Sequence, residues 1–240
     1  MDGADPPPAA GAAPRRGRPP KLSRNVVVGA AIALLDSAGE SALTFRALAA
    51  ELHTGVGGIY HYVASKDEVL DAATNEILGR VVAAADLPAD PYEALRVLSM
   101  DLYLAMQAHP WSGAYLMRDT GMQPNSMRLF ELFGRQVMRL NLTPRQTFDA
   151  VSSLVSFVVG VGAEMRQLPA EKMVEGKTQA EYLQEIAQEW RSLDPEEFPF
   201  VHAVADEFAT HDDVEQFRAG VDLFLAGLAR RASCDAAPES

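Results

Sequence analysis

The sequence predicts an all-α protein, in which a small N-terminal three-helix head precedes a larger C-terminal helical domain. Three observations support this prediction. Apolar residues recur at the three- and four-residue spacing of amphipathic helices through most of the chain. Helix-start signals, in which Ser, Thr or Asp stands three residues before Glu or Gln, precede several of these segments. We find no convincing strand pattern and no internal repeat.

The first helix is predicted over about residues 24–38, where Gly39 ends it because glycine readily adopts the conformation that closes a helix. Its buried face is formed by Val27, Ala31, Leu34, Leu35 and Ala38. Thr44 is the expected N-cap of a short second helix that ends near Leu52.

A tight turn at residues 53–55 leads into a third short helix, predicted over residues 56–63. Residues 65–68 (Ser-Lys-Asp-Glu) form a capping-box sequence, so a fourth helix is expected to start there and to run past Val81.

Prolines and capping residues divide the rest of the chain into further helices. Residues 90–93 and 143–146 are the clearest helix starts, and Pro110 and Pro169 end the helices that reach them. The predicted helices are residues 91–109, a short one at 111–118, then 125–140, 144–168, 181–191 and 211–231, with another helical signal at 194–197.

These elements divide the chain into four parts. Residues 1–21 are predicted to be a disordered basic arm, 22–66 the head, 67–232 the helical body, and 233–240 a disordered tail. The net charge of −12 is unevenly distributed. Residues 15–66 hold seven basic and three acidic residues, whereas residues 81–240 hold 13 basic and 24 acidic ones. A basic head on an acidic body would orient the protein on DNA. For the body, a solvated acidic surface that helps solubility is the preferred interpretation.

The head has the parts of a DNA-binding helix-turn-helix: a short helix, a tight turn, a second short helix and a lysine near the next helix start. Ala49 is small, as required where the two helices cross closely. The predicted miniature core consists of Leu43, Leu48, Leu52, Ile59 and Val63.

In residues 22–85 the chain resembles the tetracycline-repressor family of bacterial regulators. The resemblance rests on Ala38-Gly39, Leu43-Thr44, Leu48-Ala49, Ile59-Tyr60, Tyr62-Val63 and Ser65-Lys66. In the body it is weaker, and rests on the corner at 109–111, on residues 125–133 and on the helix at 217–228. It implies a homodimer that binds double-stranded operator DNA and responds to a small molecule.

Several residues of the head are candidates for contact with DNA. Hydroxyl, guanidinium and ammonium groups at helix starts can bind phosphate, and exposed side chains of the third helix can reach base edges. The alternative for each aromatic residue is packing in the small core. The candidates are Thr44, Arg46, Val56, Tyr60, His61, Tyr62 and Lys66.

The head departs from the family pattern at two places. His53 replaces the usual glycine of the turn, and His is among the few residues tolerated at positive φ. Gly57 and Gly58 stand where relatives often carry DNA-contacting side chains. The basic arm is expected to compensate, because Arg16-Gly17-Arg18-Pro19 looks like an AT-hook core that lays arginines in a narrow minor groove. Arg16, Arg18 and Lys21 are its candidate contacts, and a merely solvated basic tail is the alternative.

The helix at residues 143–168 is apolar on more than one side, so it is expected to be buried on two sides. The resemblance implies that it and the helix at 214–228 form a four-helix dimer interface with their symmetry mates. A central helix of a monomeric bundle is the alternative.

Methionine and aromatic residues are concentrated between residues 100 and 133, as suits an adaptable apolar cavity, although ordinary core packing is the alternative for each. The predicted ligand contacts are Met106, His109, Trp111, Tyr115, Arg118, Phe133, Phe157, Glu164 and Met165. A metal role for His109 is disfavoured, because no partner with metal-site spacing accompanies it.

The sequence shows no signal for catalysis: it has no phosphate-binding glycine loop, nucleophile elbow or zinc pattern. The one cysteine excludes an internal disulfide framework, the N-terminus lacks a secretory core, and no uninterrupted apolar run has the length of a membrane span. We therefore expect a cytoplasmic, cofactor-free, non-enzymatic regulator, a repressor released by a small apolar or aromatic molecule. The alternatives are a ligand-independent architectural DNA protein and an enzyme with an accessory DNA-binding head.

Overall fold

The computed structural model describes residues 22–116, 123–164 and 176–235. This part of the chain is helical and contains no strand, so the predicted all-α class is confirmed. Its helices are α1 (Arg24–Ala42), α2 (Phe45–Glu51), α3 (Val56–Tyr60), α4 (Lys66–Ala84), α5 (Pro91–Ala108), α6 (Pro110–Leu116), α7 (Pro124–Met138), α8 (Pro144–Glu164), α10 (Gln179–Ser192), α11 (Pro199–Thr210) and α12 (Asp213–Asp235).

The head is formed by α1–α3, and its local signals act as predicted. The backbone of α1 breaks at Gly39, whose φ of 72° is the left-handed conformation that favours glycine. The Thr44 hydroxyl caps α2 by accepting from the Ala47 amide at 3.1 Å. His53 has the positive φ predicted for the turn, 50°. The third helix is shorter than predicted: it ends at Tyr60, whereas the sequence predicted an end at residue 63.

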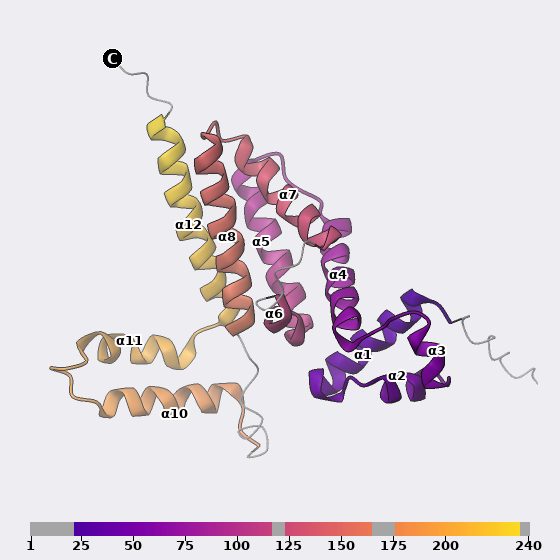
Figure 1. Cartoon of the computed structure of the whole chain (residues 1–240). Coiled ribbons are helices and arrows are strands. Elements are labelled where there is room, and N and C mark those ends of the chain that lie inside the picture. Colours follow the sequence, from indigo (N-terminus) through magenta and orange to yellow (C-terminus); the bar gives the residue numbers. More distant parts are fainter. Residues whose placement is uncertain (1–21, 117–122, 165–175, 236–240) are drawn as a thin grey trace, which may run out of the picture.

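The long helix α4 connects the head to the body (Figure 1). Its first half, up to Ile77, packs into the head core with Val27, Leu35 and Ile59. Leu78 and Val81, one turn further along, already belong to the body core. The head core therefore extends past Lys66, where the sequence placed the boundary of the domain.

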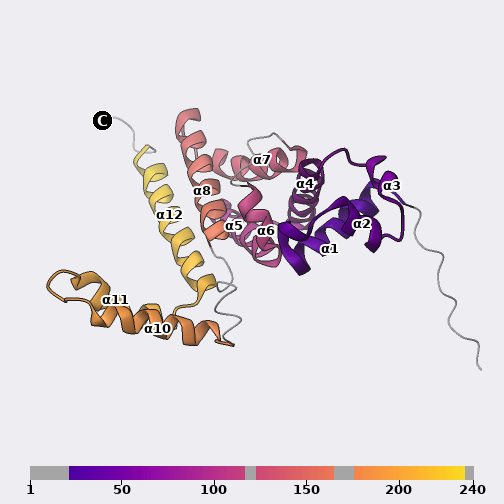
Figure 2. The ribbon, with the colours of Figure 1, turned by 60° about the horizontal axis from the view of Figure 1, so that its bottom comes forward.

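The body is a bundle of α5, α7, α8 and α12, with α6 lying between it and the head (Figures 1 and 2). Its core is centred on Phe133, Leu154, Val158 and Phe217, each at most 1% exposed. Prolines at the first positions of α5, α7 and α8 start these helices without leaving a buried amide unsatisfied.

A helical hairpin of α10 and α11 stands away from the bundle, roughly across the ends of α8 and α12 (Figure 1). Trp190 and Phe208 hold it together with ring centroids 4.2 Å apart, and Arg191 forms an ion pair with Asp206. The sequence prediction was wrong here. Residues 194–197 form a turn rather than a helix, and α11 begins only at Pro199.

Two large apolar side chains on the outer surface of α8 and α12 are exposed. Phe148 on α8 is 60% exposed and Leu223 on α12 is 77% exposed. By length and composition α8 qualifies as a membrane-spanning helix, but the core helices of soluble proteins pass the same test. Large apolar side chains exposed on a packed bundle are typical of a protein interface.

Candidate nucleic-acid interface and effector cleft

Five of the predicted DNA-contacting side chains are exposed on the head, Thr44 among them. Arg46 lies on α2, Val56 and Tyr60 lie on α3, and His61 follows directly after it. Val56 is 37% exposed and Tyr60 is 58% exposed, although both are apolar or aromatic. The rings of Phe45 and Tyr60 are in edge-to-face contact, with centroids 4.6 Å apart. This contact holds the Tyr60 ring in place while its hydroxyl stays accessible.

Thr44 is exposed, and its hydroxyl oxygen is used as the helix cap. Accepting from the Ala47 amide leaves the hydroxyl hydrogen available, so Thr44 can still donate to a phosphate. This geometry is compatible with the predicted role.

Tyr62 and Lys66 have structural partners that the sequence did not reveal. The Tyr62 hydroxyl donates to the Leu22 carbonyl at 2.9 Å, which fixes the start of α1. Because this bond uses its only proton, we assign Tyr62 a structural role in place of the predicted phosphate contact. The Lys66 ammonium donates to the Glu40 carbonyl at 2.7 Å and lies 3.8 Å from the Glu40 carboxylate. Lys66 thus braces the break in α1, and only its remaining hydrogens are available to DNA.

The two glycines of α3 differ in what surrounds them. A Cβ atom on Gly58 would lie 2.9 Å from the Thr54 hydroxyl, so a larger residue there would have to displace the Thr54 side chain. A Cβ on Gly57 would meet no atom within 4 Å, and Gly57 is exposed. Packing within the head therefore does not explain the glycine at position 57.

The predicted arm residues Arg16, Arg18 and Lys21, and the predicted ligand contacts Arg118 and Met165, lie outside the described residues.

Three of the predicted ligand contacts lie instead at the junction between head and body. The Asp36 carboxylate, on α1, lies 2.8 Å from His109 Nδ1 and accepts from Trp111 Nε1 at 2.7 Å. Trp111 packs in the head core, and the Tyr115 hydroxyl donates to Asp71 on α4. The structure therefore gives His109, Trp111 and Tyr115 partners at this junction, and none of the three lines the cleft described below. Through these hydrogen bonds and the packing of their rings, the three side chains connect the region of α6 to α1 and α4.

The same junction extends to the start of α7. Asn125 donates its backbone amide to the Asn75 side chain at 3.0 Å and its side-chain amide to the Asn75 carbonyl at 2.8 Å. Residues from α6 and α7 thus form hydrogen bonds to α4 at Asp71 and Asn75. A displacement of these body helices would therefore move α4.

Met106 and Phe133, two further predicted ligand contacts, are core residues in the structure. Met106 is 1% exposed and Phe133 is fully buried. They pack among the helices of the body core, and neither lines the cleft described next.

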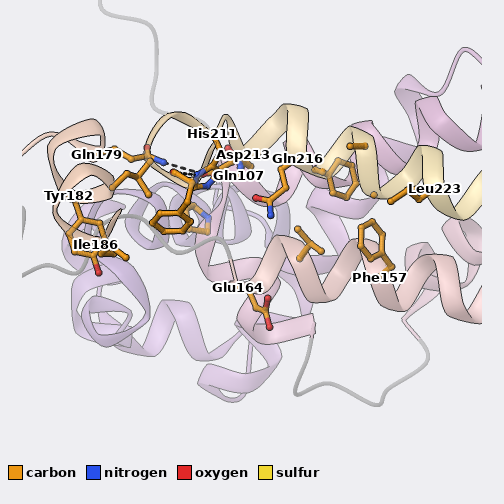
Figure 3. Close-up of a pocket in the computed structure, with 17 residues that line it drawn as sticks. Gln107, Phe157, Glu164, Gln179, Tyr182, Ile186, His211, Asp213, Gln216 and Leu223 are labelled. Atoms are coloured by element: carbon orange, nitrogen blue, oxygen red, sulfur yellow. Dashed lines mark hydrogen bonds and ion pairs between the residues drawn. The ribbon is translucent and has the colours of Figure 1, made fainter. Parts of the chain in front are cut away.

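A cleft of about 780 Å³ lies where the α10–α11 hairpin meets the bundle (Figure 3). Its volume is within the range of sites for drug-sized ligands, roughly 300–1,000 Å³. Two predicted contacts, Phe157 and Glu164 on α8, do line it. The other principal lining residues come from the end of α5, the hairpin and α12, and include Gln107, Gln179, Tyr182, Ile186, Phe208, His211, Asp213, Gln216, Phe217 and Leu223.

The hairpin residues of this cleft were missed because the hairpin itself was not predicted. The available signal was the spacing of Tyr182, Leu183 and Ile186, which places them on one face of α10. The sequence could not show that this face points back at α12.

A smaller cavity of about 210 Å³ lies between α4, α5, α7 and α8. Met127 and Phe130, two members of the predicted Met and aromatic cluster, line it with Leu102, Val155 and Val159. It is smaller than most ligand sites, so the hairpin cleft is the better candidate for a multi-ring molecule.

The cleft is acidic. His211 Nε2 lies 3.1 Å from the Asp213 carboxylate, which also accepts from the Gln179 side chain at 3.2 Å. Nearby, Gln107 donates to the buried Tyr103 hydroxyl, and burial together with the charge of Asp213 raises the pKa of Tyr103 to about 12. Among the described residues we find no cluster of His, Cys, Asp and Glu that suits a metal ion.

Comparison with known proteins identifies a family for both the head and the body. Residues 27–73 match the family model for bacterial regulatory proteins of the tetR family, and residues 86–232 match that for the tetracyclin repressor-like C-terminal domain. The chain is 28% identical over 225 residues to the HTH-type transcriptional repressor DrrR1 of Streptomyces coeruleorubidus, covering 91% of this chain and 81% of the relative.

Solved structures agree. The TetR transcriptional regulator SCO7222 of Streptomyces coelicolor is 38% identical, with a TM-score of 0.73 over 88% of this chain and 99% of the other. Apo ActR of the same organism is 23% identical, with a TM-score of 0.74 over 90% and 98% of the two chains. At this identity the likeness to ActR shows the fold alone.

Proposed function

This chain belongs to the tetracycline-repressor family of bacterial regulatory proteins, and we propose that it is a homodimeric repressor that leaves its operator when a small molecule enters the hairpin cleft. It is a DNA-binding transcriptional regulator. The observation that carries the proposed mechanism is the junction at α6, which connects helices lining the cleft to both α1 and α4 of the head.

DNA contact is assigned to the exposed surface of α2 and α3. Arg46 and Thr44 bind phosphate at the start of α2, Tyr60 adds a phosphate contact, and Val56 and His61 meet base edges in the major groove. Lys66 keeps a secondary role, because part of its hydrogen-bonding capacity is used on Glu40. The basic arm at residues 1–21 adds contacts in the minor groove.

Dimerisation is assigned to the outer surface of α8 and α12. Phe148 and Leu223 would lose their unfavourable exposure when a second copy covers this face. Leu223 also borders the hairpin cleft, so the partner subunit lies next to the ligand site in such a dimer. A two-fold dimer presents its heads to half-sites about 34–36 Å apart.

Coupling from cleft to head runs through the end of α8. Val161 and Glu164 line the cleft, and a Cβ on Gly113 of α6 would lie 3.1 Å from the Cα of Ala163. Because α6 touches α8 this closely, a ligand that displaces the end of α8 must move α6. That movement reaches Asp36 on α1 and Asp71 on α4, and changes the separation of the two heads.

Relatives support a ligand-responsive repressor without identifying the ligand. DrrR1 is described as a transcriptional repressor, and structures of ActR have been solved with actinorhodin and with (S)-DNPA. The description of DrrR1 supports repression as the direction of regulation, and the ActR complexes show that this fold can bind organic molecules.

The test is footprinting of the purified protein on the DNA upstream of its own gene, with and without candidate metabolites. We expect a protected two-fold symmetric site that is lost when an effective metabolite is added. Protection that no metabolite changes, together with a normal dimer, would instead support a ligand-independent DNA-binding protein.

A further inference from the structure

The walls of the hairpin cleft present aromatic faces to whatever enters. Phe157 and Phe217 are nearly parallel, with centroids 5.9 Å apart, and Tyr103 stacks on Phe217 at 4.1 Å. Phe217 and Tyr103 are buried, whereas Phe157 is only partly covered and lines the opening. From the hairpin, Tyr182 and Phe208 face the same space, and Phe208 is fixed by its contact with Trp190. A planar ring system can therefore be held between α8, α12 and the hairpin.

The charges around this space have one sign. Glu164 on α8 and Asp213 on α12 line the cleft, and no lysine or arginine does so among the residues that the structure describes (Figure 3). Of the described lining residues, His211 is the one potential cation, and it already lies against Asp213. By sequence, residues 165–175 carry two basic and two acidic residues, so their composition adds no net charge.

Both features disfavour an acidic ligand. A carboxylate or sulfonate would lose water while facing two carboxylates, and none of the described lining residues is an arginine that could bind it. Two interactions favour the binding of a cation: carboxylates attract it, and so do the faces of aromatic rings, which carry negative partial charge. The glutamine side chains at positions 107, 179 and 216 offer both donors and acceptors, so they do not select for charge.

We propose that the effector of this regulator is a planar aromatic molecule that carries a protonated amine, bound between the aromatic walls with its positive charge toward Glu164 and Asp213. This inference rests on the proposed function, which leaves the class of effector open. It differs from the apolar effector expected from the sequence, because the acidic residues of the cleft come from helices distant in the chain.

A matched pair of probes tests the charge requirement. 9-Aminoacridine is a cation at neutral pH, and acridine-9-carboxylate has the same ring system with a negative charge. Each is titrated by calorimetry into the full-length dimer without DNA. We expect the cation to bind about tenfold more tightly, a difference of about 1.4 kcal/mol, because the two carboxylates are partly exposed and each contributes only modestly.

Substitution of the acidic residues locates the effect. The double variant Glu164→Gln with Asp213→Asn should reduce the preference to less than about threefold, because the shapes are kept and the charges are lost. Glu215→Gln is the matched control, since Glu215 lies on α12 near Asp213 but does not line the cleft. If the double variant fails to fold, Glu164→Gln alone must still lower the preference measurably.

The outcomes separate this inference from the proposed function. Equal binding of the two probes, tighter binding of the anion, no binding of either, or a preference that Glu215→Gln removes as well would overturn the inference. Release of operator DNA by a neutral or acidic metabolite would keep the regulator and reject the cationic effector. Tight, Glu164-dependent binding of 9-aminoacridine without release of operator DNA would support the cleft chemistry and contradict the proposed coupling.

Discussion

The substitution Asp36→Ala tests the junction between head and body. It removes the acceptor that lies 2.8 Å from His109 Nδ1 and 2.7 Å from Trp111 Nε1. Trp111 is 9% exposed, so its indole N–H loses its acceptor in a nearly dry place, at a cost of about 1–3 kcal/mol. The Asp36 side chain is 32% exposed, and water replaces part of the loss, so we expect about 1–2 kcal/mol.

Thermal unfolding followed by circular dichroism measures this loss. For a chain of this size each kcal/mol lowers Tm by about 2–4 °C, so the expected decrease is about 2–8 °C. A double-mutant cycle with Trp111→Phe isolates the indole bond, and its coupling free energy should be at least about 0.5 kcal/mol. Ser37→Ala is the control, since the exposed Ser37 hydroxyl only donates to the Leu34 carbonyl.

The same variant should respond less to effector. With Asp36 removed, α6 keeps its bond to Asp71 but loses its hold on α1, so more effector is needed to release DNA. A Tm unchanged within error, zero coupling with Trp111→Phe and a normal effector response would together refute the assignment of this junction.

Four further predictions concern other parts of the molecule. Arg46→Ala should weaken operator binding and reduce the slope of log K against log salt by about one, and an unchanged slope would exclude a phosphate contact. Removing residues 1–21 should lower affinity for A·T-flanked operators while leaving the dimer intact; equal affinities would eliminate the arm. Leu223→Glu should give a monomer by light scattering at micromolar concentration, because a carboxylate would be buried in the proposed interface; a persisting dimer would place the interface elsewhere. The Ala64 amide and Arg24 hold the pKa of Glu68 below its ordinary value of 4.5, so its stabilisation is present above that value and lost as pH falls through the lowered pKa. Glu68→Gln should therefore lower Tm at pH 7 and match the unmodified protein in acid, whereas a pH-independent difference would contradict this account.

Helix boundaries were the most predictable part of the structure, because local side chains set them. The caps at Thr44, Ser65 and Asp90 accept from the amides two or three residues ahead, so the signal and its effect lie within one turn. The same holds for the break at Gly39 and the positive φ of His53, which depend on single residues.

The candidate sites were less predictable, because long-range pairing determines them. Trp111 looked like a pocket residue since it lies in a stretch rich in Met and aromatic residues, yet its indole bonds to a carboxylate 75 positions earlier. Tyr62 is paired with Leu22, 40 positions away, and the sequence gives no indication of such partners. Composition alone could not distinguish a residue that lines a cavity from one that fills a core.

The open space at Gly57 has a consequence for how such a regulator acquires new targets. Because a side chain there would meet no protein atom within 4 Å, position 57 can change without repacking the head. A side chain at its neighbour Gly58 would have to displace Thr54, so of the two glycines in α3 it is Gly57 that can gain a side chain without moving a neighbour. A duplicated copy of the gene could therefore diverge in operator choice through a single codon, while keeping its effector and its dimer partner unchanged.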